Sequence, residues 1–423
     1  MTHGRTAVLL VSSFMLGAAG AAAQTPLPTP VASPSPEEAE KPPGRLRLGP
    51  VYFTPRLHIG SIGLDTNVFY TATERQTDVA GSGGPAIDLV IPFSSAVRLN
   101  GSAGIDYLYF ARTESQRRFV GNGRVALEAK GSRTGIDIEA KYFETFSRPS
   151  FEVDRRVAVT TRAAALEVWR RLVGRTRLVL GGEASDDRVS SGESFLGTDL
   201  RQTLSRESRV GKVGLGYALT FKTSLRIDGE YEVVRFPLDE SRDGTRTLGT
   251  VGLEVVSATR LSGDVRVGVR MQRFDARPAA DSETMAYVAA DVIWRLSRRW
   301  RWRVGYDRDL LYSSLVVAGT PTLERAAWLA SLELELLPRV DLRLGALRTE
   351  LRSEAPIVFE PRPGLVSEVR RDDVAHQALA ELGFRVFRQL RMGVTAAYSE
   401  RRSQIADLGV DGLLVGGTVT FTP

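Results

Sequence analysis

The stretch Arg299-Trp-Arg-Trp-Arg-Val-Gly-Tyr306 alternates between charged and apolar residues. Successive side chains of a β-strand point to opposite faces, so its three arginines share one face and its two tryptophans share the other. A helix would spread the same charges around its circumference. The stretch therefore predicts a strand with one charged and one apolar face.

The same alternation recurs in Gly135–Tyr142, Leu225–Val233, Leu332–Leu336 and Val340–Leu344. Only a closed, lipid-facing sheet needs apolar residues outside and polar residues inside. We expect the charged faces to line a water-filled lumen. The candidate pore-lining residues are Asp137, Glu139, Lys141, Arg226, Asp228, Glu230, Arg266, Arg301, Arg303, Glu333, Glu335 and Arg343.

The connections between strands show a second regularity, because short and long gaps alternate. Gly131-Ser132 and Pro338 are short gaps, whereas Thr71–Gly84 and Asp186–Ser205 are long. Short periplasmic turns alternating with long outer loops are typical of an outer-membrane barrel. The expected strands are 51–69, 85–92, 95–112, 118–130, 133–146, 155–171, 174–187, 206–219, 223–236, 245–257, 261–275, 283–297, 299–313, 323–337, 339–352, 371–387, 389–401 and 410–422.

This pattern predicts an all-β fold, an antiparallel transmembrane β-barrel of about 18 strands (16 to 18) over residues 45–423. An even number of strands leaves both chain ends on the periplasmic side. A soluble β-sandwich is the alternative, but its loops would not alternate so regularly. Its outward face would also not be built of Trp, Ile, Leu and Tyr.

The first residues predict export. A short polar region with His3 and Arg5 precedes an apolar stretch from Ala7 to Gly20, and Ala21-Ala22-Ala23 supplies the small residues of a cleavage site. We expect residues 1–23 to be a cleavable signal peptide and the Pro-rich residues 24–44 to be a disordered periplasmic tether. The predicted location is the outer membrane of a Gram-negative bacterium.

Composition argues against several function classes. The chain has no cysteine, three histidines and a formal charge of +6. The arginines are spread through strands without forming a basic patch, so no nucleic-acid partner is expected. His58 and His376 lie far apart and have no Ser partner, which argues against a hydrolase, a metal site or any cofactor. The Gly-rich segment Gly81–Gly84 is expected to lie in a loop and lacks the context of a phosphate-binding turn.

Two segments resemble the outer-membrane family called β-barrel porin 2. Pro55–Phe69 is similar to its first strand, and Arg148–Arg156 is similar to its Glu-containing segment before a middle strand. The resemblance implies export of an exopolysaccharide or capsule across the outer membrane, with a periplasmic polysaccharide export protein and the polysaccharide as partners. The last strand, which ends at Phe421-Thr-Pro423, resembles the signal read by the barrel-assembly machinery.

Three functions remain open at this point: a polysaccharide conduit, a general diffusion porin for small solutes, and a plugged barrel whose loops bind surface polymers. The lumen charges could form a paired ladder that braces the wall or an arginine track for an anionic polymer. We expect ion pairs between Arg301 or Arg303 and Glu333 or Glu335. Aromatic residues, among them Trp169, are expected mainly in the girdles that contact outer-membrane lipid and lipopolysaccharide.

Overall fold

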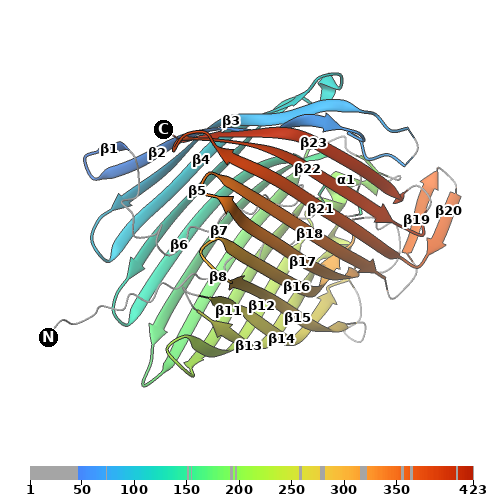
Figure 1. Ribbon diagram of the computed structural model, residues 1–423. Coiled ribbons are helices and arrows are strands. Elements are labelled where there is room, and N and C mark those ends of the chain that lie inside the picture. The colour runs from blue at the N-terminus through green and yellow to red at the C-terminus, as the bar shows by residue number, and fades with distance from the viewer. Residues whose placement is uncertain are drawn as a thin grey trace.

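The computed structural model is a closed antiparallel barrel (Figure 1). The structure describes residues 46–72, 74–149, 152–153, 155–190, 194–195, 198–256, 260–276, 282–314, 322–353, 357–362, 365–405 and 408–422. The main sheet has 19 strands, of which β1 (Leu46–Leu48) is a three-residue addition beside β2. The other eighteen pair in sequence order, which confirms the predicted fold class and strand number.

The barrel strands are 12 to 16 residues long, more than the roughly 9–11 residues that a tilted strand needs to cross a bilayer. They are β2 (Val51–Asp65), β3 (Asp78–Pro92), β4 (Val97–Phe110), β5 (Arg118–Lys130), β6 (Thr134–Ser147), β7 (Val157–Arg171), β8 (Thr176–Val189), β11 (Arg206–Ala218), β12 (Thr223–Arg235), β13 (Gly244–Val255), β14 (Leu261–Phe274), β15 (Glu283–Arg295), β16 (Trp300–Tyr312), β17 (Thr322–Leu337), β18 (Val340–Arg352), β21 (Asp372–Arg385), β22 (Leu390–Arg402) and β23 (Val410–Phe421).

The remaining elements lie in the connections at the long-loop end, on the right of Figure 1. They include the helix α1 (Leu200–Leu204) and two hairpins, β9–β10 (Ser194–Phe195 and Thr198–Asp199) and β19–β20 (Ile357–Arg362 and Leu365–Val369). Short 3-10 helices occupy Glu114–Gln116 and Glu240–Arg242. Among the described residues, no helix is long and apolar enough to cross a membrane.

The barrel closes where the first long strand meets the last. β2 pairs with β23 from Leu57↔Phe421 to Asp65↔Leu414, with a register shift between Ile59 and Ile62. The two backbones approach closely at Gly63, where an added Cβ would lie 1.9 Å from the carbonyl oxygen of Val415. Closure leaves no open sheet edge, which is the condition for a sheet to cross lipid.

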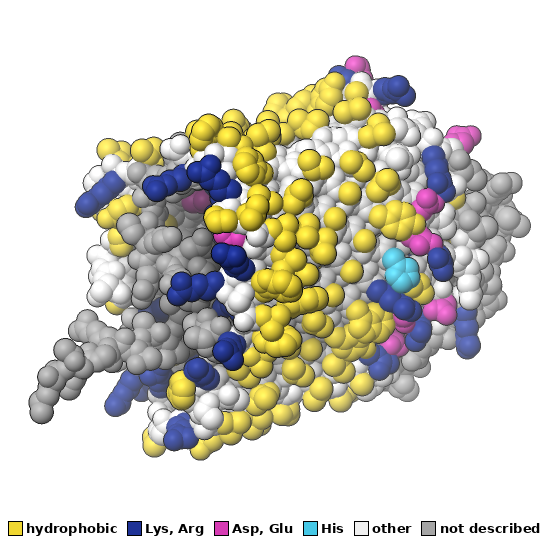
Figure 2. All heavy atoms as spheres, in the orientation of Figure 1, with side chains coloured by type: hydrophobic (Ala, Val, Ile, Leu, Met, Phe, Trp, Pro, Cys, Tyr) yellow, Lys and Arg dark blue, Asp and Glu magenta, His cyan; other side chains and the backbone are white. Residues whose placement is uncertain are grey.

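Apolar side chains form a belt across the face of the barrel shown in Figure 2. Exposed apolar side chains lie on all eighteen barrel strands, so the belt continues around the outside. On β14, Val265, Val267 and Val269 are 44–53% exposed, and they alternate with inward Asp264 and Arg266. Such exposure of apolar side chains on every strand would be unfavourable in water and is favourable in hydrocarbon. The chain is therefore an outer-membrane β-barrel of the kind found in Gram-negative bacteria.

Three sequence predictions need comment. The segment Gly81–Gly84 lies within β3 and pairs with β4, so its assignment to a loop was wrong. It escaped detection because glycines carry no side chain whose alternation could mark the two faces. The predicted signal peptide (1–23) and tether (24–44) lie outside the described residues.

Candidate functional site: the lumen and its outer mouth

The predicted pore-lining residues lie on the face opposite the apolar belt, and most of them form ion pairs. Arg301 bonds Glu333 across β16 and β17 with an N···O distance of 3.4 Å, as expected. Arg303 does not pair with Glu335. The register places Arg303 opposite Ser331, and its guanidinium instead forms a bidentate bond to Asp291 at 2.8 and 3.0 Å.

Seven of the other nine predicted residues form short pairs along or across strands. All of these side chains share the inward face, and four of the pairs join residues two positions apart on one strand. Lys212–Glu230 joins β11 to β12, which is the cross-strand arrangement that stabilises neighbouring strands. Glu335 lies exposed near the periplasmic end of β17. The pairs are Lys141–Glu139 (2.9 Å), Arg226–Asp228 (3.1 Å), Arg266–Asp264 (2.9 Å), Arg343–Asp341 (3.6 Å) and Lys212–Glu230 (4.0 Å).

Asp137 lies in a row of three acidic residues. It is directly opposite Glu128 on β5 and Glu167 on β7. Glu128 bonds Lys130 at 2.7 Å and Arg98 at 3.1 Å, whereas Asp137 has no ion pair within the described part of the chain. Like charges directly opposite one another destabilise a sheet.

We expect Asp137→Asn to stabilise the barrel, because the change removes repulsion and keeps the size of the side chain. The free energy of unfolding should rise by about 0.2–1 kcal/mol. Urea unfolding in lipid vesicles measures it. Asp264→Asn is the matched control and should be destabilising, since Asp264 accepts a bond from Arg266 at 2.9 Å. Equal effects of the two variants would contradict this account of the row.

A second row on the adjacent arc of the wall is basic. Arg177 on β8 is opposite Gly216, Gly216 is opposite Arg226, and Arg226 is opposite Gly252. Gly252 in turn is opposite Arg266 on β14. We call Arg177, Arg226 and Arg266 the arginine row. Acidic and basic side chains thus gather on neighbouring arcs of the lumen.

The arginine row borders a cavity of about 460 Å³, which we call the basin. Turn residues such as Gly174 and Lys222 line one end, so the basin opens toward the periplasmic side. Eight basic and six acidic residues line it, an excess of two positive charges. Small residues, among them Gly181, Gly214 and Gly216, make room for the hollow.

Loops from opposite sides of the barrel bond to one another at the outer mouth. Glu152, between β6 and β7, accepts bonds from the Ser313 hydroxyl at 2.8 Å and the Ser314 N–H at 2.5 Å. These serines follow β16, which β8 and β11–β15 separate from β7 along the sheet. The side chain of Arg371 donates to Glu152 at 2.7 Å and to Asp373 at 2.5 Å.

Arg242 adds two more loops to this network. Its guanidinium donates to the carbonyl oxygens of Thr203 and Ser313, both at 2.5 Å. Burial lowers the pKa of Arg242 to about 10, which leaves it charged at neutral pH. We call these side chains and their loop partners the mouth cluster; its members are Glu152, Thr203, Arg242, Ser313, Ser314, Arg371 and Asp373.

An apolar core supports the mouth cluster. Val153, Leu200 and Leu408 are fully buried and belong to one group of packed side chains, although they come from three different connections. Leu200 begins α1, within the long gap Asp186–Ser205. The sequence identifies this gap as a long outer connection, but its pattern does not indicate which residues it contacts.

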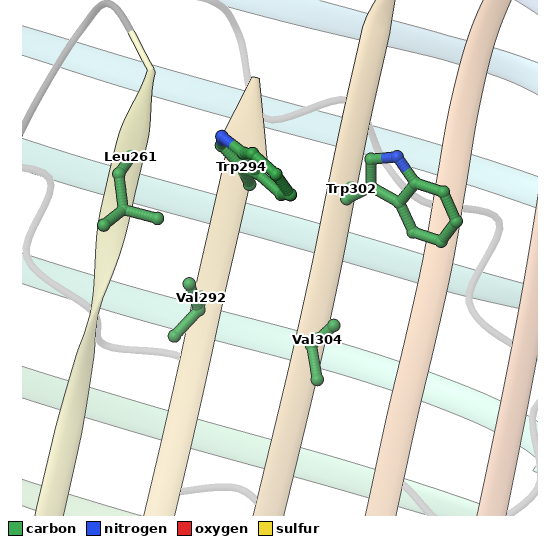
Figure 3. Close-up of a pocket in the computed structure, with 5 residues that line it drawn as sticks. All are labelled: Leu261, Val292, Trp294, Trp302 and Val304. Carbon is green, nitrogen blue, oxygen red and sulfur yellow. The ribbon is translucent and has the colours of Figure 1, made fainter. Parts of the chain in front are cut away.

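Two aromatic features of the barrel wall differ in position. Trp169 faces the lumen and is 6% exposed, so its assignment to the lipid girdle was wrong. It packs over Gly135, and the Arg177 guanidinium lies 4.8 Å from its ring centroid. In contrast, Trp294 and Trp302 face outward. With three aliphatic neighbours on β14 to β16 they line a shallow apolar groove (Figure 3), in the lipid-facing belt.

The two histidines of the described region lie apart. His58 faces the lumen, with Nε2 3.0 Å from Asp106 Oδ1, and His376 sits on β21 between Arg348 and Glu400. Among the described residues, no group of three or more His, Asp or Glu side chains is arranged to hold a metal ion.

In comparisons with known proteins, the chain is similar only to solved structures. No protein-family model matches the chain. No curated protein matches it. Among solved structures, it is similar to OccK3 (OpdO) of Pseudomonas aeruginosa, with 14% identity, a TM-score of 0.47, and coverage of 88% of this chain and 95% of that one.

Two further structures complete the comparison. The outer membrane protein OpdK of Pseudomonas aeruginosa is 11% identical with a TM-score of 0.45, over 88% of this chain and 98% of that one. The siderophore receptor PirA of the same organism is 8% identical with a TM-score of 0.43, over 90% and 81%.

Proposed function

We propose that this outer-membrane barrel is a passive diffusion channel for small charged solutes, with an outer mouth narrowed by the mouth cluster. The bonding of Glu152 across the mouth to Ser313 and Arg371 carries the proposal. A bore that passes a polymer needs a clear mouth, whereas small solutes can pass between packed loops. Paired charges on the lumen wall suit weak and transient contacts with such solutes.

The lumen also supports charge-dependent passage. Acidic residues gather on β5 to β7 and the arginine row on β8 to β14. Rings and rows of charge close to a narrow path set ion selectivity in channels. Because basic residues outnumber acidic ones in the basin, we expect a preference for anions.

The test is single-channel recording with the purified protein in planar bilayers. We expect steady currents and a reversal potential that indicates anion preference in a salt gradient. Arg226→Glu should shift that potential toward cations, because it exchanges a positive for a negative side chain at the basin wall. An absence of current in the wild type would contradict the proposal and favour the plugged barrel.

Export of an exopolysaccharide, with a periplasmic export protein as partner, is a second candidate. The resemblance to β-barrel porin 2 suggests it, and the periplasmic opening and basic excess of the basin favour it, since an anionic polymer would enter there. A deletion strain separates the two. Loss of surface polymer with periplasmic accumulation, restored by complementation, would favour export. Unchanged surface polymer would leave the small-solute channel.

A further inference from the structure

We propose that the basin contains a binding site for the carboxylate group of a small organic anion, located over Gly216 between Arg177 and Arg226. The site deepens the proposed channel function by naming a class of solute. It is built from three adjacent strands, β8, β11 and β12, whose register places the glycine between the two arginines.

The space for the anion lies at Gly216. An added Cβ there would have no neighbour closer than 4.0 Å, so the wall is open at this point. Adjacent strands lie about 4.8 Å apart, so the two arginine backbones are separated by roughly 10 Å. Two arginine side chains can reach a common anion from either side of such a slot.

Both guanidiniums have capacity to donate. The carboxylate nearest to Arg177 is Glu167, at 3.9 Å, which is beyond hydrogen-bond distance. Arg226 bonds Asp228 through Nη2 at 3.1 Å, but its Nη1 is 3.9 Å from Glu254. Hydrogen bonds between a guanidinium and a carboxylate are strong.

Arg177 is also held in position. Its guanidinium lies 4.8 Å from the ring centroid of Trp169, which packs over Gly135. A stacked arginine keeps its planar edge free for donation to a carboxylate. Farther along the basin, Leu248 and Tyr287 add apolar side chains to its lining. A volume of about 460 Å³ suits a small organic molecule.

The experiment is equilibrium binding of benzoate to the detergent-solubilised full chain by isothermal titration calorimetry. Benzyl alcohol and benzylamine keep the ring but lack the negative charge, and inorganic phosphate is an anion without the organic body. We expect binding of benzoate and none of benzyl alcohol or benzylamine. Tighter binding of phosphate than of benzoate would overturn the assignment to organic carboxylates.

Two variants locate the site. Gly216→Leu fills the slot and keeps every charge, and Arg226→Gln removes one donor, so each should weaken benzoate binding about tenfold or more. Gly211→Leu is the matched control on the same strand. Its Cβ also meets nothing within 4 Å, but it points outward, and binding should be unchanged. Wild-type affinity in both lumen variants would overturn the site.

Binding in detergent does not require solute to pass through the barrel. The proposed binding site and the proposed channel function can therefore be contradicted independently. Normal anion conductance without benzoate binding would remove the site and leave the channel. Benzoate binding without conductance would remove the channel and leave the site.

Discussion

Replacing Arg371 by Met should lower the free energy of unfolding by about 3–5 kcal/mol, the largest effect that we expect from one substitution in this chain. The Arg371 side chain is 1% exposed and lies between Glu152 and Asp373, whose side chains are 4% and 2% exposed. Removing the cation takes an ion pair from each of these two buried carboxylates. The same change should raise single-channel conductance, because Glu152 loses one of the bonds that hold its loop across the mouth.

Urea unfolding in lipid vesicles, followed by tryptophan fluorescence, measures the first effect, and planar-bilayer recording measures the second. Arg402→Met is the matched control. Its side chain is 75% exposed and pairs with Glu400 at 2.7 Å, so solvent screens the pair and the expected loss of stability is small. A triple variant that adds Glu152→Gln and Asp373→Asn should recover part of the stability, since the two carboxylates that Arg371 compensated are then neutral. Equal stability of Arg371→Met and Arg402→Met would show that the mouth cluster does not hold the loops.

The sequence predicts the barrel wall well because one local rule determines it. Alternation in the stretch that holds Trp300 and Arg301 assigns each residue to lipid or lumen, and the same alternation predicted the pair Arg301–Glu333. The rule fails where side chains carry no information, as at Gly81–Gly84. Residue type is a weaker guide, and it misplaces a side chain where it disagrees with the alternation. Trp169 looked like a girdle aromatic, but its position beside Glu167 and Arg177 is inward.

The mouth cluster could not be predicted from local pattern. Glu152 bonds residues that lie 161 and 219 positions away, and the connections between them follow no repeat. The resemblance of Arg148–Arg156 to a family segment drew attention to the stretch that holds Glu152, without indicating its partners. The sequence also indicated part of the arginine row without showing how its members are arranged. Arg226 and Arg266 were candidates, but only the register across β12 to β14 places them in one row with Gly252 between.

The second large effect that we expect is the loss of stability when a charge is placed in the apolar belt. The outward residues of β14 lie at successive depths in the membrane, so one strand can test it. Val267 is 53% exposed, lies opposite Val251 and Val288 on the neighbouring strands, and sits in the middle of the outward row from Leu261 to Met271. An arginine at the midplane of a bilayer destabilises a barrel by about 2–4 kcal/mol, and one near the interface by about 0–1 kcal/mol. Val267→Arg should therefore cost several times more than Leu261→Arg.

Leu261 is the appropriate partner because it is equally lipid-facing, at 46% exposure, but begins the strand directly after Arg260 at the periplasmic end. Both substitutions place an arginine on the same face of the same strand. The strand propensity and the size of the new side chain are therefore the same, and the two variants differ mainly in their depth in the membrane. Val267→Leu controls for the loss of valine and should be close to neutral. Urea unfolding in vesicles would give the two free energies. If Val267→Arg and Leu261→Arg were equally mild, the outward face of β14 would not cross hydrocarbon at Val267. If both variants lost several kcal/mol of stability, the membrane boundary would lie on the periplasmic side of Leu261. The apolar belt would then extend to the periplasmic turns.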